Sequence, residues 1–345
     1  MFYITENSPS AFAEFLSNNG IDRYRAKQVL DWIYKKSKLD FSDFTNLPKQ
    51  VVYFLKAKCV ILTAQTVKIS VSGSDKTKKF LIKLKDNNLI ESALLHSEGN
   101  RLTACLSTQV GCAISCVFCA SGKTGFKRNL TVSEIMSQYL LMRHDAVLAK
   151  NDITNIVFMG IGEPLLNYDN LMSAIGLLTD SSCANIGARH ITVSTSGVVP
   201  GIERLSDYKK QIRLSVSLHS AFDEKRDVLA PINRKYRLNA LIKVIKGYIT
   251  KTSKPVTFEY VLIKGLNDKK EDVSGLVKLL KGIDCKINLI PYNRIEGLGF
   301  KQPNGSDVEE FAEGLVKNRI KVIRRQRKGF DINSGCGQLK ANWVT

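Results

Sequence analysis

The sequence lacks the features that would place the chain in a membrane or stabilise it through disulfides. No run of 18 apolar residues occurs, and Glu6 and Glu14 interrupt the first twenty residues, where a signal peptide needs a continuous apolar stretch. Eight cysteines in 345 residues are too few for a disulfide scaffold. We therefore expect a cytoplasmic protein that makes no contact with a membrane.

Acidic residues are also scarce. The chain has 32 Asp and Glu against 51 Lys and Arg, a formal net charge of +19, while 44% hydrophobic residues suffice for a large core. The excess of positive charge favours a polyanionic partner, although a Lys-rich proteome produces basic proteins without such a role. The positions of the basic residues are therefore more informative than their number.

The first sixty residues have the pattern of a small helical module. Ser8 and Pro9 predict the start of a helix, and Gly20 predicts its end. Two further stretches repeat apolar residues at helical spacing: Ala26, Val29, Leu30 and Ile33 in one, and Leu47, Val51 and Leu55 in the other. Residues 80–84 and 89–95 then predict a β-hairpin.

Short strands alternate with helices from residue 102 onward. The expected strands are residues 102–107, 155–159, 190–195, 213–218, 256–263 and 286–290. The expected helices lie near residues 131–149, 171–179, 238–251 and 269–281. Two capping boxes, Thr131 to Glu134 and Ser306 to Glu309, predict helix starts. Such alternation predicts a parallel sheet with right-handed crossovers.

Six strand–helix units are enough for an open partial barrel and too few for a closed eightfold one. The predicted fold class is α/β, a partial (β/α)6 barrel with a helical module, a β-hairpin extension and a C-terminal extension. The corresponding segments are residues 1–60 for the module, 61–98 for the hairpin, 99–295 for the barrel and 296–345 for the C-terminal extension. Chemistry in such folds lies at the carboxyl ends of the strands.

Three cysteines stand in a short loop directly after the first barrel strand: Cys112, Cys116 and Cys119. No fourth Cys or His follows at zinc-finger spacing, and a structural zinc site needs four protein ligands. Three thiolates suit a cubane iron–sulfur cluster with one iron left free for another ligand. A zinc site completed from afar and cysteines that merely pack in the core stay open as alternatives.

Further candidate residues follow other strands at the same edge. Gly162 and Glu163 come directly after the second strand, where glycine lets the backbone approach a ligand and a carboxylate accepts hydrogen bonds from an ammonium group. The other rim residues are Ser194, Ser217, Leu218, His219 and Asn293. Each of these alone is more typical of a cap or a turn, so their convergence at one edge is what favours a ligand site.

Cys336 lies near the end of the chain between Gly335 and Gly337. Flanking glycines leave the thiol sterically open, which suits a reacting cysteine better than a packed one. The alternative is a free surface cysteine beside a mobile tail.

Taken together, these motifs resemble the RlmN family of adenosine methyltransferases, a branch of the radical S-adenosylmethionine superfamily with Cfr as its sister group. The resemblance covers nearly the whole chain, from residues 24–28 through the three-cysteine loop, residues 162–167 and 217–219 to residues 336–339. Pro164 is typical of RlmN, whereas alanine is expected there in Cfr. Ile161 and Ser334-Gly335 depart from the family pattern without removing a ligand or a reacting atom.

The resemblance implies a radical-SAM barrel with a [4Fe-4S] cluster on Cys112, Cys116 and Cys119, and two molecules of S-adenosylmethionine per turnover. The implied cofactor-binding residues are Gly162, Glu163, Ser194, Ser217, Leu218, His219 and Asn293. The implied reaction is methylation of carbon 2 of adenosine in 23S rRNA, at the peptidyl-transferase centre, and in tRNA, 3′ of the anticodon. Carbon-8 methylation of the Cfr type and a non-catalytic zinc RNA-binding protein are the alternatives.

By the same resemblance, Cys336 first receives a methyl group, and a 5′-deoxyadenosyl radical then removes a hydrogen atom from it, so that the carbon radical adds to adenine. Cys105 would release Cys336 through a transient disulfide. Glu91 matches a carboxylate assigned as proton acceptor, and the choice between Glu91 and Cys105 as the base stays open. A flavodoxin-type electron donor and a monomeric state are further expectations.

Two groups of basic residues border the expected site. Seven of the twelve residues from Lys317 to Lys328 are Lys or Arg, and a second patch of Lys123, Lys127 and Arg128 lies beside the cysteine loop. Such runs are commonly solvated surfaces, but at this place they favour contacts with RNA phosphates, which weaken steeply with salt. The target adenine must also leave its stack to be modified.

Overall fold

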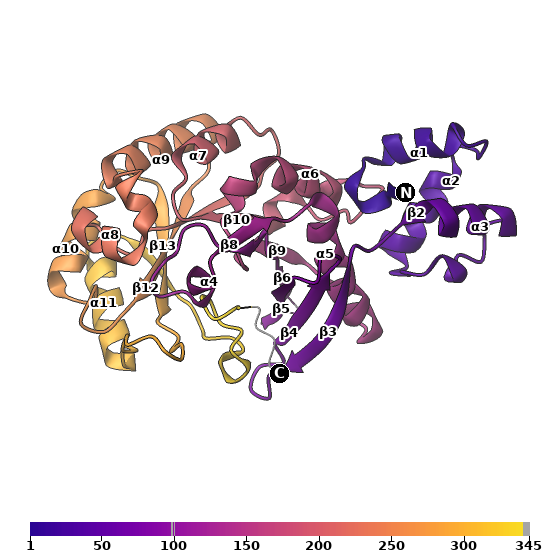
Figure 1. Ribbon diagram of the computed structural model, residues 1–345. Helices are drawn as coiled ribbons and strands as arrows, with labels where there is room; N and C mark the ends of the chain where they lie inside the picture. Colours follow the sequence, from indigo (N-terminus) through magenta and orange to yellow (C-terminus); the bar gives the residue numbers. More distant parts are fainter. Residues whose placement is uncertain (98, 100, 341–345) are drawn as a thin grey trace.

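A ten-stranded sheet forms the centre of the molecule, and its strand order is β14-β13-β12-β11-β10-β9-β6-β5-β4-β3 (Figure 1). The computed structural model describes residues 1–97, 99 and 101–340. Both edges of this sheet, β14 and β3, are unpaired within it, so the barrel is open. The sheet confirms the α/β class and the partial barrel.

Seven strands of this sheet, from β6 to β14, pair in parallel in the order in which they follow along the chain, with the separate β7–β8 pair inserted between β6 and β9. They are β6 (Arg101–Cys105), β9 (Asn155–Phe158), β10 (Ile191–Thr195), β11 (Arg213–Ser217), β12 (Val256–Leu262), β13 (Cys285–Pro291) and β14 (Lys321–Arg324). The first six match the predicted strands. The seventh, β14, was not predicted, because its residues belong to the basic run and its side chains are mostly exposed.

The predicted hairpin is β4 (Lys78–Leu84) and β5 (Leu89–Ser97), and β3 (Ala64–Val71) adds a third antiparallel strand. Because β5 pairs with β6, these strands continue the barrel sheet rather than forming a separate one. A second, two-stranded sheet of β7 (Gln109–Gly111) and β8 (Phe126–Asn129) flanks the cysteine loop.

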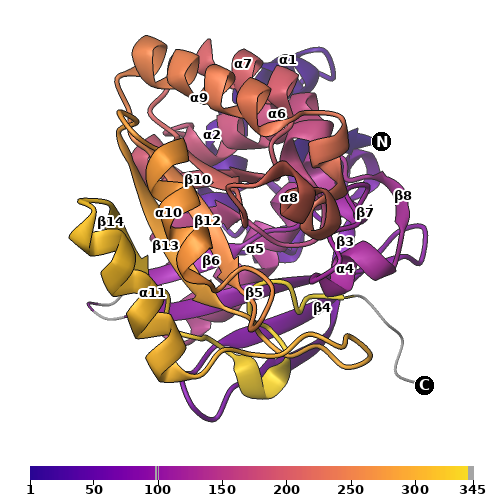
Figure 2. The same cartoon turned by 90° about the vertical axis from the view of Figure 1, so that its left-hand side faces the viewer.

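Helices cover the outer face of the parallel strands (Figures 1 and 2). They are α5 (Val132–Leu148), α6 (Tyr168–Thr179), α7 (Val199–Ser206), α8 (Asp223–Leu229), α9 (Leu238–Thr252), α10 (Lys270–Leu279) and α11 (Gly305–Lys317). The capping box of Thr131 and Glu134 is present at α5. The capping box predicted at Ser306 and Glu309 is wrong, because α11 begins earlier and is capped by Asn304 and Asp307.

The N-terminal module contains α1 (Pro9–Ser17), α2 (Arg25–Leu30) and α3 (Lys49–Lys58), and Ser8 caps α1 as predicted. A π-helical turn, Asp31–Lys35, continues α2, and short strands β1 (Phe2–Tyr3) and β2 (Cys59–Val60) pair beside it. The module is fixed to α5: the Thr5 and Ser133 hydroxyls lie 2.8 Å apart, and Arg143 donates to the Tyr34 carbonyl. The helical module is thus attached to the barrel through polar contacts as well as apolar packing.

The remaining short helices lie in the connections. They are α4 (Ala120–Lys123) and the 3-10 turns Ile4–Glu6, Phe41–Asp43, Pro164–Asn167, Ala188–His190, Pro231–Arg234 and Phe330–Ile332. Among the described residues, no helix combines the length and the apolar character needed to span a bilayer.

Candidate active site

Two cavities meet at Cys336. The first, which we call the thiol cavity, has a volume of about 150 Å³ and is lined by Cys112, Cys116 and Cys119 at the carboxyl ends of the strands. The second, the basic cavity, has a volume of about 220 Å³ and contains five cations: Arg101, Arg324, Arg325, Arg327 and Lys328. Cys336 and Asn293 line both cavities, so this cysteine stands in the wall between them.

A larger open groove, of about 1370 Å³, lies between α10 and α11. Several of its charged groups are ion-paired with each other, such as Lys264 with Asp307 at 2.7 Å. It is remote from the three-cysteine loop and brings together no group of thiols, so the two smaller cavities are the better candidates for chemistry.

Local backbone geometry shapes the three-cysteine loop. Gly111 has a φ of +74°, and a Cβ atom there would lie 1.6 Å from the Gly125 carbonyl oxygen, so only glycine fits. The Cys112 amide donates to that same carbonyl at 3.2 Å. The loop is therefore held by the β7–β8 pair at its start and turns directly into the cavity.

The donor set of the loop fits an iron–sulfur cluster. All three thiols are free of disulfides and line one cavity. Burial raises the pKa of Cys112 to about 12 and that of Cys116 well above its usual range, and neighbouring thiols add to both shifts. Thiolates crowded in this way need a bound cation to hold their charge.

A single metal ion fits less well than a cluster. Within residues 1–97, 99 and 101–340, no three His, Cys, Asp or Glu side chains are grouped closely enough to hold one ion. In a cubane each thiolate binds a different iron, so the sulfurs stand farther apart than around one zinc ion.

Glu163 is buried at the floor of the thiol cavity and is held by backbone and side-chain donors. Its Oε2 accepts from the Ser196 amide and the Ser196 hydroxyl, both at 2.7 Å, and its Oε1 accepts from the Leu165 amide at 3.1 Å. Burial raises the pKa of this carboxyl, while the donors oppose that shift. The preceding Gly162 has a φ of +107° and leaves no room for a side chain against Gln109.

The other rim residues divide into two groups. Ser194, Ser217 and His219 line the thiol cavity with Asn293, whereas the Leu218 side chain is fully buried in the hydrophobic core. His219 accepts a hydrogen bond from the Val261 amide at its Nδ1, 3.1 Å away. Burial lowers the pKa of His219 to about 3, so its imidazole is neutral and carries its proton on Nε2.

Arg226 is a rim residue that sequence reasoning missed. This fully buried guanidinium donates to the carbonyls of Ser196 at 2.6 Å, Ser217 at 3.1 Å and Leu218 at 3.0 Å, and to Asn233 Oδ1 at 2.9 Å. It therefore ties together the loops that follow β10 and β11. No sequence motif marks it, because its acceptors are backbone carbonyls from distant segments.

The segment around Cys336 is fastened to the cysteine loop. The Ala120 amide donates to the Gly337 carbonyl at 2.7 Å, and the Ser121 hydroxyl donates to the Leu339 carbonyl at 2.6 Å. Asn293 Nδ2 donates to the Cys336 carbonyl at 3.2 Å. Cys336 itself is exposed, but the cavity walls around its sulfur raise its pKa, an effect that Arg325 opposes.

Cys105 and Glu91 lie on the neighbouring strands β6 and β5. Cys105 is buried, and its pKa is raised to about 12. The main cause is burial, and the second cause is Cys336. Glu91 forms an ion pair with Lys79 at 3.1 Å and accepts from the Lys340 amide at 2.8 Å, and burial raises its pKa. The structure thus places the C-terminal segment over Glu91, and Cys336 contributes to the raised pKa of Cys105.

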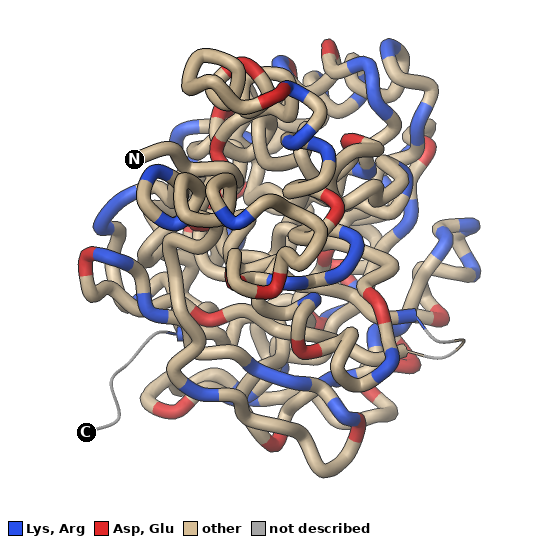
Figure 3. The backbone as a smooth tube through the Cα atoms, turned by 90° about the vertical axis from the view of Figure 1, so that its right-hand side faces the viewer, with Lys and Arg blue, Asp and Glu red and all other residues tan. Residues whose placement is uncertain are grey.

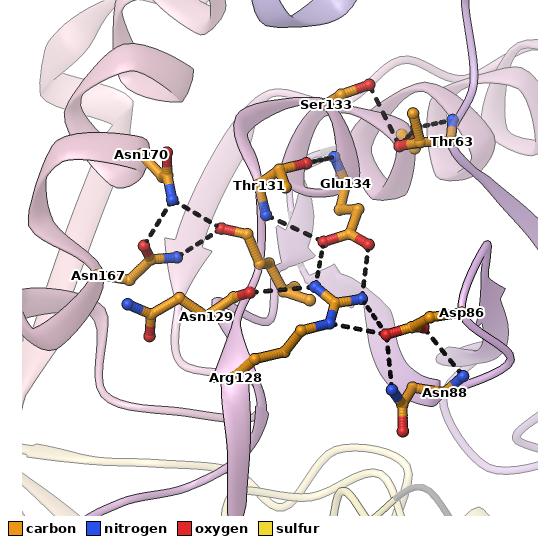
Figure 4. Close-up of polar contacts among 12 residues, drawn as sticks. Thr63, Asp86, Asn88, Arg128, Asn129, Thr131, Ser133, Glu134, Asn167 and Asn170 are labelled. Carbon is orange, nitrogen blue, oxygen red and sulfur yellow. Dashed lines mark hydrogen bonds and ion pairs between the residues drawn. The ribbon is translucent and has the colours of Figure 1, made fainter.

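In the second predicted basic patch, Lys127 and Arg128 already make polar contacts within the fold. Arg128 is paired with Asp86 at 2.7 Å and with Glu134 at 2.8 Å, and this network anchors the start of α5 (Figure 4). Lys127 donates to Asn88 at 2.9 Å. The prediction that Arg128 contacts RNA is not tested by the structure, which shows that its guanidinium already makes ion pairs within the fold.

Lys and Arg recur over the whole face seen in Figure 3, with acidic segments between them. Positive charge is therefore not confined to one stripe of that face. What distinguishes the basic cavity is that its cations lie next to a thiol.

Comparison with known proteins agrees with the sequence and the geometry. Residues 106–278 match the radical SAM superfamily, and residues 4–61 match the ribosomal RNA large subunit methyltransferase N-terminal domain. The chain is 42% identical over 344 residues to a probable dual-specificity RNA methyltransferase RlmN of Akkermansia muciniphila, covering 98% of this chain and 95% of the relative.

A relative of the same description from Pseudothermotoga lettingae is 44% identical over 329 residues, covering 95% of this chain and 94% of the relative. A crystal structure of a radical SAM methyltransferase from Sphaerobacter thermophilus superposes with a TM-score of 0.97 at 37% identity, covering 99% of this chain and 100% of that one. The chain therefore belongs to the RlmN family of radical S-adenosylmethionine methyltransferases.

Proposed function

We propose that this protein methylates carbon 2 of adenosine in 23S rRNA and in tRNA, with Cys336 as the carrier of the methyl group. The observation that supports this most directly is that Cys336 lines both the thiol cavity and the basic cavity. A thiol in the wall between a cofactor site and an RNA site can receive a methyl group on one side and deliver it on the other. The names of the relatives support RNA as the substrate.

The family's [4Fe-4S] cluster and S-adenosylmethionine, when bound, supply the methyl group and the radical chemistry. On this proposal Cys112, Cys116 and Cys119 hold the cluster. Glu163 orients the amino group of S-adenosylmethionine, because its carboxylate faces the same cavity and is fixed by Ser196. The remaining cofactor contacts are assigned to Gly162, Ser194, Ser217, His219 and Asn293. Leu218, also expected there, is buried in the core, and its carbonyl accepts from Arg226.

Cys105 is proposed to release Cys336 from the RNA by forming a transient disulfide with it. The contribution of Cys336 to the raised pKa of Cys105 supports this assignment. Glu91 is proposed as the acceptor of the ring proton, since it is the buried carboxylate on the strand next to Cys105. For Glu91 to act, the contact with the Lys340 amide must open.

The basic run from Lys317 to Lys328 is proposed to bind phosphates near the target adenosine. Four residues of this run line the basic cavity: Arg324, Arg325, Arg327 and Lys328. Of these, Arg324 forms an ion pair with Glu309 at 2.8 Å.

We also propose a role for each segment of the chain. Residues 1–60 act as the accessory module, residues 61–98 as the hairpin extension, residues 99–295 as the barrel, and residues 296–345 as the carrier of the reactive cysteine. A flavodoxin-type reductant and a monomeric state stay predictions.

Nucleoside mass spectrometry of separated rRNA and tRNA tests this proposal in cells that lack the protein. Cells restored with the wild type should regain 2-methyladenosine, cells restored with Cys336→Ala should not, and the buried-thiol control Cys59→Ala should behave as the wild type. Appearance of 8-methyladenosine would show that the assigned carbon is wrong. Absence of any methylated adenosine with the wild type would remove the RNA assignment.

A further inference from the structure

Three cations stand at the starts of parallel strands, at the end of the open barrel opposite the cysteine loop, and a fourth cation follows the last strand of the sheet. Arg101, Arg213 and Lys286 stand at the starts of β6, β11 and β13, and Arg325 follows β14; together we call them the four-cation cluster. Because these strands are parallel, their starting ends lie at the same end of the sheet. Residues far apart in the sequence are thereby brought to the same end of the sheet, on strands that are not direct neighbours.

Strand alternation directs the cluster toward the barrel interior. Side chains two residues apart point to the same face, so Arg101 shares its face with Thr103, and Lys286 shares its face with Ile290; Thr103 and Ile290 both line the basic cavity. Arg213 shares its face with Ser217, which lines the thiol cavity. Arg325 is fixed through its amide, which donates to the Leu289 carbonyl at 2.9 Å.

Arg101 and Arg325 line the same cavity, and repulsion among the cations lowers the pKa of Arg101 and of Lys286. The pKa of Arg101 is lowered by burial and by neighbouring Arg213 and Arg325. The pKa of Lys286 is lowered by burial, by Arg213 and by the other two arginines, with Glu259 as the opposing carboxylate. In the part of the chain that the structure describes, none of the four forms an ion pair within 4 Å. Such a cluster is stabilised when an anion binds to it.

We propose that the four-cation cluster binds a phosphodiester group of the RNA strand that carries the target adenosine. The inference rests on the proposed function and extends the phosphate-binding surface from Arg325 of the basic run to Arg101, Arg213 and Lys286, which lie outside that run. Arg101 and Cys336 line one continuous cavity, so a nucleotide can place its base at the thiol and its phosphate at the strand starts. Glu259 lines the thiol cavity, and its carboxylate would repel a phosphate there. The phosphate is therefore expected in the basic cavity and not in the thiol cavity.

Salt-dependent RNA binding tests this site. The variant Arg101→Gln/Arg213→Gln is compared with Arg204→Gln/Arg237→Gln, in which two exposed arginines that pair with Asp169 and Asp227 on the outer helices are changed. Dissociation constants for an unmodified tRNA transcript are measured between roughly 50 and 200 mM salt. We expect the cluster variant to bind roughly tenfold more weakly near 100 mM salt, with a log–log salt slope smaller by about 1.5, and the outer-helix variant to match the wild type.

Phosphate contacts carry no sequence information, so the same loss should occur with a transcript whose target adenosine is replaced. Methylation of Cys336 by S-adenosylmethionine without RNA should keep its wild-type rate in the cluster variant. An unchanged affinity and slope would overturn the phosphate site while leaving the proposed function intact. Failure of the wild type itself to bind RNA or to form 2-methyladenosine would instead overturn the proposed function.

Discussion

The two cavities that meet at Cys336 are built from opposite kinds of residue. The thiol cavity is lined by neutral or hydrogen-bonded groups, with Glu163 held by three donors and His219 kept neutral by burial. The basic cavity is lined by arginines, of which Arg101 and Arg325 have no ion-pair partner among the described residues. The thiol cavity is therefore suited to a compact ligand that makes many fixed contacts. The basic cavity is suited to an anion whose negative charge balances the arginines.

This difference means that the same residue type has different consequences on the two sides. Arg226 donates four hydrogen bonds inside the fold, whereas Arg101 faces open space beside other cations. Removing the first should damage the structure, and removing the second should damage only the attraction for an anion. Predictions that separate these effects test whether the two cavities work independently.

The largest effect is expected at the thiol pair that joins the cavities. In Cys105→Ala no second thiol is available to release Cys336 from the RNA, so turnover should stop after one methyl group per enzyme and leave a covalent protein–RNA adduct. Denaturing gel electrophoresis of enzyme incubated with a tRNA transcript measures this adduct. The control Cys59→Ala should turn over repeatedly, and repeated turnover by Cys105→Ala would show that another group resolves the adduct.

Arg226→Met should be the most damaging change for stability. It leaves three carbonyls and the Asn233 amide oxygen without their buried donor, which costs about 3 kcal/mol and lowers Tm by about 4 °C. The exposed Arg237→Gln should change Tm by less than about 1 °C, since surface ion pairs contribute little. Thermal denaturation of both variants checks the contrast, which equal Tm shifts would contradict.

Glu163→Gln should weaken the thiol cavity alone. Loss of the charged acceptor for an ammonium group is expected to lower the affinity for S-adenosylmethionine by about 10- to 100-fold in the cluster-loaded enzyme. The affinity for RNA should stay unchanged, because Glu163 is buried away from the basic cavity. Equilibrium dialysis with each ligand measures the two affinities, and a parallel loss of both would show that the cavities are coupled.

Much of the thiol cavity could be predicted from the sequence because its residues follow strands in short, contiguous motifs. The three-cysteine loop (Cys112, Cys116 and Cys119) and the capping box at Thr131 are both formed by residues that lie close together in the sequence. Their spacing along the chain is therefore enough to predict them. Arg226 could not be found in this way, since its acceptors come from loops after separate strands.

The four-cation cluster escaped prediction for a related reason. Arg101, Arg213 and Lys286 stand at the starts of strands that are far apart in the chain and reach the same end of the molecule only when the parallel sheet forms, whereas Arg325 belongs to the predicted basic run. Arg128 shows the converse, since its sequence neighbours suggested a free basic patch while Asp86, distant in the chain, neutralises it. Charge patterns along a sequence therefore report local density but not which charges are paired in space.

The smallest effect concerns a second buried carboxylate, Glu259, which contrasts with Glu163. Its Oε1 accepts from Ser215 and Asn288, but its Oε2 is buried without a partner. Burial raises the pKa of Glu259 above its value in the unfolded chain. Between these two pKa values the folded protein binds more protons than the unfolded one, so this group lowers stability as the pH rises through the window.

Glu259→Gln removes that dependence because an amide stays neutral. The variant should gain Tm relative to the wild type by about 2 °C at pH 8 and by less near pH 5, where the wild-type carboxyl is closer to its protonated form. Thermal denaturation at both pH values measures the difference, with the exposed Glu203→Gln as the control that should show no pH-dependent gain. A larger gain at pH 5 than at pH 8 would mean that the cations around Glu259, with Arg325 and Lys286 closest to it, outweigh its burial, and that the charge of the basic cavity extends into the thiol cavity.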